Sequence, residues 1–126
     1  MSYKTDMNRV AGLGSAKRGV DHFVAQRVSA IALIVLLPLF LYTFIGSLAQ
    51  GHAAVLATYS RPLPALIAIM FMVTVFRHLR LGMQVVLEDY VSNHRLLLKC
   101  LIVNMLIWRA AAIVGVFAVA KIAFSA

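Results

Sequence analysis

Long apolar runs separated by short polar stretches are the dominant pattern along this chain. No residue from Val28 to Ser60 is charged, and an α-helix needs about 20 predominantly apolar residues to cross a bilayer. Runs of sufficient length lie at about 24–48, 64–90 and 96–124. We therefore predict an all-α membrane protein with a transmembrane domain of three helices over residues 24–124, preceded by a basic tail over residues 1–23.

Two features modify the first run. Pro38 lies inside it, and a transmembrane helix tolerates the kink that a proline introduces. Gly46, Gln50 and Gly51 mark its end, and the connection from there to Pro64 is short and only mildly polar. We expect that connection to run along the membrane surface.

The composition agrees with a chain embedded in lipid. Of 126 residues, 63% are hydrophobic and 13% are charged, and the mean hydropathy is +0.92. Soluble domains hold about 45–50% apolar and about 25% charged residues, so a soluble domain and a disordered chain are both excluded. The net charge of +8 does not indicate nucleic-acid binding, because the basic residues punctuate the apolar runs instead of forming one patch.

The distribution of lysine and arginine predicts the topology. Seven of the twelve lie in or close to the tail or the second connection, two at the opposite ends of the spans and three deeper inside them. Because cytoplasmic segments carry the basic excess, we predict a cytoplasmic N-terminus. The first run is too long for a signal peptide, and a tail with two acidic residues is unlike a transit peptide, which favours a bacterial inner membrane. The seven basic residues on the cytoplasmic side are Lys4, Arg9, Lys17, Arg18, Arg27, Arg95 and Lys99.

One face of the second run carries groups that are costly in lipid, and such groups are functional candidates by default. With His78 placed at zero on a helix of about 100° per residue, Gly82 falls at about 40° and Asp89 at about 20°. The stripe thus holds a histidine near mid-membrane, a glycine one turn on and a carboxylate at the cytoplasmic end.

Two interpretations of His78 follow from this spacing. A neutral imidazole can coordinate haem iron, and the missing side chain at Gly82 lets a flat macrocycle approach the backbone. Alternatively, His78 hydrogen-bonds to a neighbouring helix and Gly82 is a packing contact. No other histidine lies inside a span, so a second axial histidine would have to come from another subunit.

Arg77 and Arg80 inside the second span are expected to pair with an anion within a protein assembly, and Arg109 inside the third span raises the same question. Haem propionates and carboxylates of a partner helix both fit Arg80, which points about 200° away from His78. The sequence assigns no role to Arg77 or Arg109. A different class of function stays open: a small transporter or channel subunit whose polar path is lined by Arg77, His78 and Arg80.

The cytoplasmic ends of the first two runs carry further candidates. Asp89 and Tyr90 either mark the membrane boundary or bind a quinone carbonyl and handle its protons. Arg27 is either a positive-inside anchor or a contact for an anionic cofactor group. Asp21 and His22 receive no role.

The run His78-Leu-Arg-Leu-Gly82, followed after six residues by Asp89-Tyr90, resembles the signature of the hydrophobic membrane anchor subunit of succinate dehydrogenase. Its spacing is H-x3-G…D-Y. The segment 19–32 resembles the start of that family's first helix, and the resemblance covers roughly residues 14–122.

This resemblance implies a function. The chain would join a second, cytochrome b-type anchor subunit in a six-helix anchor for a flavoprotein and an iron–sulfur subunit. Electrons from succinate would reach ubiquinone or menaquinone at the cytoplasmic edge, with a haem b between the anchor subunits. It implies that His78 is an axial haem ligand, that Tyr90 and Asp89 bind quinone, and that Arg27, Gly82 and Arg80 are haem-adjacent or propionate candidates. Such a subunit would have no activity alone.

Overall fold

The computed structural model describes Met7 and residues 19–125, and every regular element in that part of the chain is helical. Helix α2 spans Gly19–Leu48, α3 His52–Tyr59, α4 Pro62–Tyr90 and α5 His94–Phe124. Three of them, α2, α4 and α5, are long and apolar enough to cross a membrane, which confirms the predicted fold class. Most of the tail predicted over 1–23, including its four most N-terminal basic residues, lies outside the described residues.

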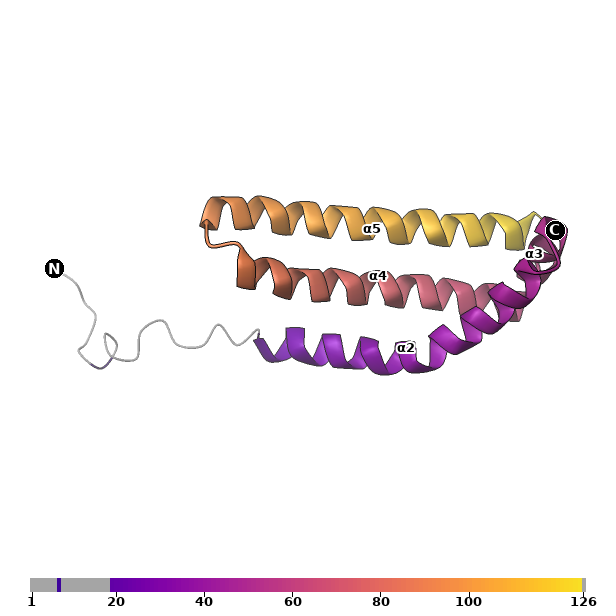
Figure 1. The fold of residues 1–126 in the computed structure, drawn as a ribbon, viewed down its shortest axis with the longest axis horizontal. Coiled ribbons are helices and arrows are strands. Elements are labelled where there is room, and N and C mark those ends of the chain that lie inside the picture. The colour runs from indigo at the N-terminus through magenta and orange to yellow at the C-terminus, as the bar shows by residue number, and fades with distance from the viewer. Residues whose placement is uncertain (1–6, 8–18, 126) are drawn as a thin grey trace.

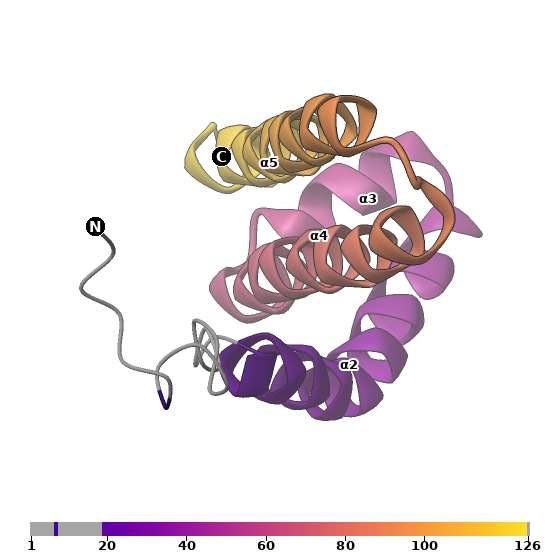
Figure 2. The same ribbon diagram turned by 90° about the vertical axis from the view of Figure 1, so that its left-hand side faces the viewer.

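The long helices lie side by side in one layer, with α4 in the middle (Figures 1 and 2). Helix α4 contacts both α2 and α5, whereas α2 and α5 do not contact each other. The start of α2, the end of α4 and the start of α5 share one end of the layer, and α3 lies at the other (Figure 1). This alternation brings residues near 20, 90 and 95 to the same end, as the predicted topology requires.

Helix α2 is bent, and its second half leans towards α3 (Figure 1). Pro38 lies inside it, and a proline removes one helical hydrogen bond and bends the axis. Beyond the proline, the Phe40 ring stacks on Phe71 of α4 with ring centroids 4.4 Å apart. The bent helix therefore keeps contact with α4.

The connection between α2 and α4 differs from the expected surface segment, because eight of its residues form α3. Gly51 precedes it with a φ of 95°, a conformation that glycine adopts without strain. Tyr59, at the end of α3, is 4% exposed, and its hydroxyl lies 3.4 Å from Thr43 Oγ1 of α2. Contact with α2, rather than intrinsic propensity, stabilises this short helix.

Helices α4 and α5 form a hairpin through Val91–Asn93. The side chain of Asn93 accepts hydrogen bonds from the backbone of Arg95 and Leu96 and so caps α5. Further along the pair, Gly115 faces Met72: a Cβ added to Gly115 would lie 3.3 Å from its Sδ.

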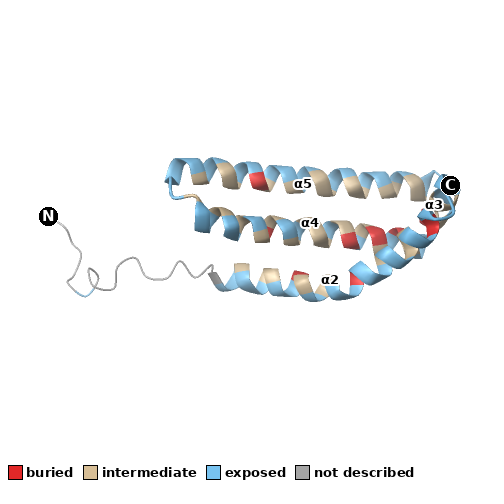
Figure 3. Ribbon diagram, in the orientation of Figure 1, coloured by how far each residue is buried: buried red, intermediate tan, exposed pale blue. Residues whose placement is uncertain are grey.

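Few side chains are buried, and large apolar side chains face outwards on all three long helices (Figure 3). A soluble protein does not expose this much apolar surface, so lipid and other transmembrane helices are the expected surroundings. The buried apolar residues are Leu36, Tyr59, Ala65, Ala68, Phe71 and Leu81.

Candidate functional site

The side chain of His78, a residue of α4, lies against a serine of the neighbouring helix α2. His78 Nδ1 is 2.9 Å from the hydroxyl oxygen of Ser29. Ser29 is 5% exposed, and its hydroxyl also donates to the backbone carbonyl of Gln26 at 2.9 Å. One ring nitrogen of His78 is therefore engaged within the chain, which leaves Nε2 as the nitrogen for an external ligand.

His78 lies near the middle of α4. It lies sixteen residues after the start of the helix and twelve before its end, or about 24 Å and about 18 Å along the axis. In a helix that spans a hydrocarbon core of about 30 Å, this position would place the imidazole well inside the membrane.

The face of α2 turned towards α4 is a polar stripe made of His22, Gln26 and Ser29. These residues follow one another at intervals of four and three positions, which places them on one side of a helix. His22 Nε2 and Gln26 Oε1 are buried without a hydrogen-bond partner in the described structure. Gln26 and Ser29 were not among the predicted site residues, although polar residues at this spacing in an apolar helix indicate a polar face.

Gly82 shares the α2-facing side of α4 with His78, as the helical geometry predicted. A Cβ added to Gly82 would lie 3.5 Å from Gln26 Nε2, an ordinary van der Waals distance. Packing against α2 therefore does not by itself require glycine at this position.

Asp89 and Tyr90 end α4 and are both exposed. Tyr90 is 83% exposed, so its hydroxyl is accessible to a ligand or a partner. Neighbouring Glu88 accepts a hydrogen bond of 2.8 Å from Gln84. The two candidates lie about 18 Å along the helix from His78, which makes them a second location rather than part of one site.

Arg27 is exposed on α2. Its guanidinium carbon lies 5.1 Å from the ring centroid of Phe23, which is a cation–π distance. The structure therefore does not bring Arg27 into contact with His78.

The three arginines of the spans gather at a different place, in a hollow between α4 and α5. This hollow has a volume of about 360 Å³ and is lined by Arg77, Arg80 and Arg109 with Val73, Phe76, Trp108 and Ala112. Among the described residues, no acidic side chain and no histidine lines it. Arg77 and Arg80 of α4 are thus grouped with Arg109, which the sequence could not relate to them because it lies on α5.

Asn104 of α5 joins the two helices beside that hollow. It is 7% exposed, donates to the backbone carbonyl of Arg80 at 3.1 Å and accepts from Trp108 Nε1 at 2.7 Å. Asn104 was not among the predicted site residues, although a lone asparagine in an apolar span indicates a polar contact between helices.

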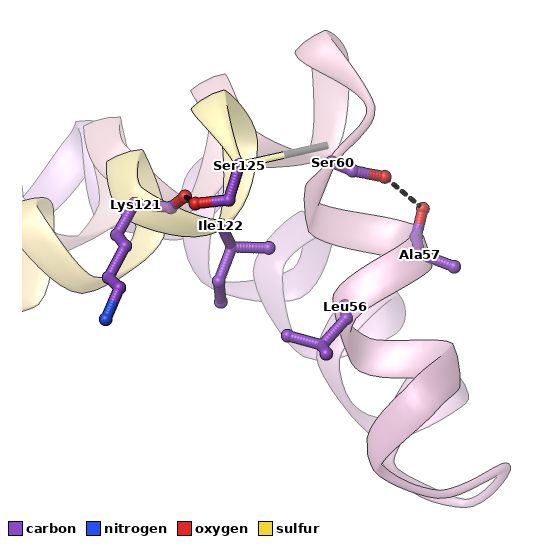
Figure 4. A pocket seen from close by; sticks show the side chains of 6 residues that line it. All are labelled: Leu56, Ala57, Ser60, Lys121, Ile122 and Ser125. Atoms are coloured by element: carbon purple, nitrogen blue, oxygen red, sulfur yellow. Dashed lines mark hydrogen bonds between the residues drawn. The ribbon is translucent and has the colours of Figure 1, made fainter.

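A larger hollow of about 530 Å³ lies at the far end of the layer, between α3 and the end of α5 (Figure 4). Its polar lining residues are Ser60, Lys121 and Ser125, and the two serine hydroxyls donate to backbone carbonyls of the preceding helical turn. None of the predicted site residues lies there.

Comparison with known proteins identifies relatives over most of the chain. Residues 1–121 match the family described as succinate dehydrogenase/fumarate reductase transmembrane subunit. A succinate dehydrogenase hydrophobic membrane anchor subunit of Paracoccus denitrificans is 38% identical over 90 residues, covering 71% of this chain and 70% of the relative. A protein of the same name from Rickettsia bellii is 30% identical over 94 residues, covering 75% of each. No solved structure matches.

Proposed function

The chain belongs to the succinate dehydrogenase/fumarate reductase transmembrane subunit family, and from this premise we propose that it is the membrane anchor subunit that helps to bind haem b and the quinone. The observation that carries the proposal is the placement of His78. A histidine deep in a span, held through Nδ1 by a neighbouring helix, presents Nε2 as a metal ligand.

The residues around His78 fit a haem in chemical terms. His22 Nε2 and Gln26 Oε1, on the same side of α2 as Ser29, are buried without a hydrogen-bond partner within the described chain, so polar groups there remain unsatisfied. The described residues contain no group of three or more His, Cys, Asp or Glu side chains that could hold a bare ion. The imidazole of His78 would hold the haem iron, and a partner subunit would supply the second histidine.

A haem b bound there would supply one-electron transfer within the membrane. The chain's own contribution would be to fix the imidazole through the contact of His78 with Ser29 of α2. Arg27 lies in the N-terminal part of α2, near the end of the molecule that is predicted to be cytoplasmic. It is a proposed contact for an anionic haem group. The same role for Arg80 stays a prediction, because Arg80 lies in the α4–α5 hollow.

Quinone binding is proposed for Tyr90 and Asp89. The Tyr90 hydroxyl is an O–H donor that suits a quinone carbonyl, and the neighbouring carboxylate can support proton delivery to that site. Their exposure at the end of α4 fits a substrate that arrives from the membrane edge and is completed by partner subunits.

The proposed assembly contains a cytochrome b-type anchor subunit, an iron–sulfur subunit and a flavoprotein subunit in a bacterial inner membrane. A single layer of three helices leaves two broad faces open, and a second three-helix subunit on one face would complete a six-helix anchor. The cytoplasmic N-terminus rests on the distribution of basic residues.

The transporter alternative predicts that Arg77, His78 and Arg80 line one path. In the structure His78 bonds to α2, whereas Arg77 and Arg80 line a hollow against α5. These groups do not form a common polar path within this chain, which favours the anchor-subunit proposal.

The test is purification of the chain from a membrane with its partners in mild detergent. We expect mass spectrometry to identify the other subunits and a reduced-minus-oxidised spectrum to show a b-type haem. His78→Ala should disturb the haem, and Tyr90→Phe should slow quinone reduction. A complex in which neither variant changes haem or quinone reduction would overturn the site assignments.

A further inference from the structure

We infer that Ser29 is a positioning residue for the haem ligand: it fixes the His78 ring with Nδ1 protonated and Nε2 free to bind iron. This inference rests on the proposed function. The hydroxyl of Ser29 lies within hydrogen-bond distance of two groups but has only one proton. A serine hydroxyl has one hydrogen to donate. The Ser29 oxygen lies 2.9 Å from the Gln26 carbonyl and 2.9 Å from His78 Nδ1.

The two partners differ in what they can do. A backbone carbonyl only accepts hydrogen bonds, so the hydroxyl proton goes to Gln26. The Ser29 oxygen then accepts from His78, which requires the proton of a neutral imidazole to be on Nδ1. The lone pair is left on Nε2, and this is the tautomer that a metal ligand of this orientation needs.

Burial strengthens this arrangement. Ser29 is 5% exposed and lies in a membrane span, where water is not available to replace either bond. Loss of the hydroxyl would leave the Nδ1 proton without its acceptor. A hydrogen bond from Nδ1 also makes the imidazole a stronger electron donor to iron, so its removal should make the haem easier to reduce.

The experiment compares Ser29→Thr with Ser29→Val in the purified complex. Threonine and valine have nearly the same shape, and only threonine keeps the hydroxyl. The readouts are haem content and the midpoint potential in a redox titration followed by the haem spectrum. We expect Ser29→Val to shift the potential to more positive values and to weaken haem retention about 10-fold, whereas Ser29→Thr stays close to the unmodified complex.

Ser47→Ala is the matched control. Ser47 is also buried on α2, and its hydroxyl donates to the carbonyl three residues earlier at 3.0 Å, but it has no bond to His78. We expect no change in potential. Equal potentials and haem content in Ser29→Val and Ser29→Thr would overturn the inference.

His78→Ala separates this inference from the proposed function. If His78→Ala leaves the haem unchanged, the ligand assignment itself fails. If His78→Ala removes the haem signal while Ser29→Val changes nothing, only the role of Ser29 fails.

A separate observation supports a second proposal: the structure assigns the arginine hollow as the docking point for a carboxylate on a partner transmembrane helix. Arg77, Arg80 and Arg109 line it, and no described residue that lines it is acidic. Unpaired charges in a span are costly and are found paired. We therefore expect the compensating anion on a partner chain.

Depth favours a protein carboxylate over a lipid phosphate. Arg109 lies fifteen residues from either end of α5, or about 22 Å along the axis, whereas half of the hydrocarbon core is about 15 Å. Lipid phosphates lie outside that core, so a helix that carries Asp or Glu near its middle is the fitting occupant.

Arg109→Lys in the purified complex provides the test. The new amine condenses with a carboxylate in contact with it when a lipid-soluble carbodiimide is added, forming an amide while the carbodiimide takes up the elements of water as a urea. We expect mass spectrometry to find this amide on Asp or Glu of a partner's membrane span. Arg61→Lys, at an exposed position before α4, is the control and should give no such product. A product confined to residues outside any span, or no product, would overturn the proposal.

Discussion

Replacing Asn104 with alanine should weaken the α4–α5 hairpin, because this side chain makes the polar link between the two helices. Its amide donates to the Arg80 carbonyl at 3.1 Å and accepts from Trp108 Nε1 at 2.7 Å. The variant removes both bonds. The Arg80 carbonyl retains its own helical hydrogen bond, whereas the indole N–H of Trp108 loses its acceptor.

The size of the effect follows from these two contacts. Side-chain hydrogen bonds between membrane helices contribute about 0.6 kcal/mol on average and up to about 1.7 kcal/mol, and a buried unsatisfied donor costs about 1–3 kcal/mol. We expect Asn104→Ala to lower the free energy of unfolding by about 1–2 kcal/mol, a factor of about 5–30 in the folded-to-unfolded ratio.

The assay is unfolding of the chain in mild detergent micelles by added sodium dodecyl sulfate, followed by far-UV ellipticity. Trp108 is the single tryptophan of the sequence, so its emission reports on the α4–α5 contact in the same samples. Gln50→Ala is the control, because the exposed side chain of Gln50, just after the end of α2, donates only to the backbone carbonyl of Gly46 four residues earlier. If Asn104→Ala were as stable as Gln50→Ala, the link between the helices would not carry the stability assigned to it.

Two further predictions concern packing and the quinone. Gly115→Leu should separate α4 from α5 and reduce the yield of complex in a co-purification, because even a Cβ at Gly115 would lie 3.3 Å from Met72. Gly46→Leu is the control and should assemble normally, because a Cβ at Gly46 would have nothing within 4 Å. Equal yields from the two variants would contradict a close contact between Gly115 and Met72. Tyr90→Phe should lower kcat/KM for quinone by about 10-fold, as expected for one lost hydrogen bond of about 1.4 kcal/mol. Electron transfer from succinate to a soluble dye should be unaffected, and a parallel loss with the dye would place the defect elsewhere.

The sequence predicted the spans well because a bilayer imposes a minimum apolar length. The helices nevertheless start two to five residues before the predicted spans, at Gly19, Pro62 and His94, since helical hydrogen bonding continues into the interface. Helix α3 was not predicted, because it depends on the contact of Tyr59 with α2 rather than on its own eight residues.

The candidate site was predicted in part. His78 could be identified from the sequence because an ionisable residue within an apolar span is easily recognised. Its partner Ser29 could not be identified, since a contact across 49 positions depends on the register of two helices. The same reason hid the grouping of Arg80 with Arg109, which lie on different helices.

The role of His78 is tested most directly by the reduced-minus-oxidised spectrum of the complex that carries His78→Ala, purified with its partner subunits. We expect the partners still to co-purify while the b-type haem signal is lost or shifted. An unchanged haem spectrum and midpoint potential would contradict the assignment of His78.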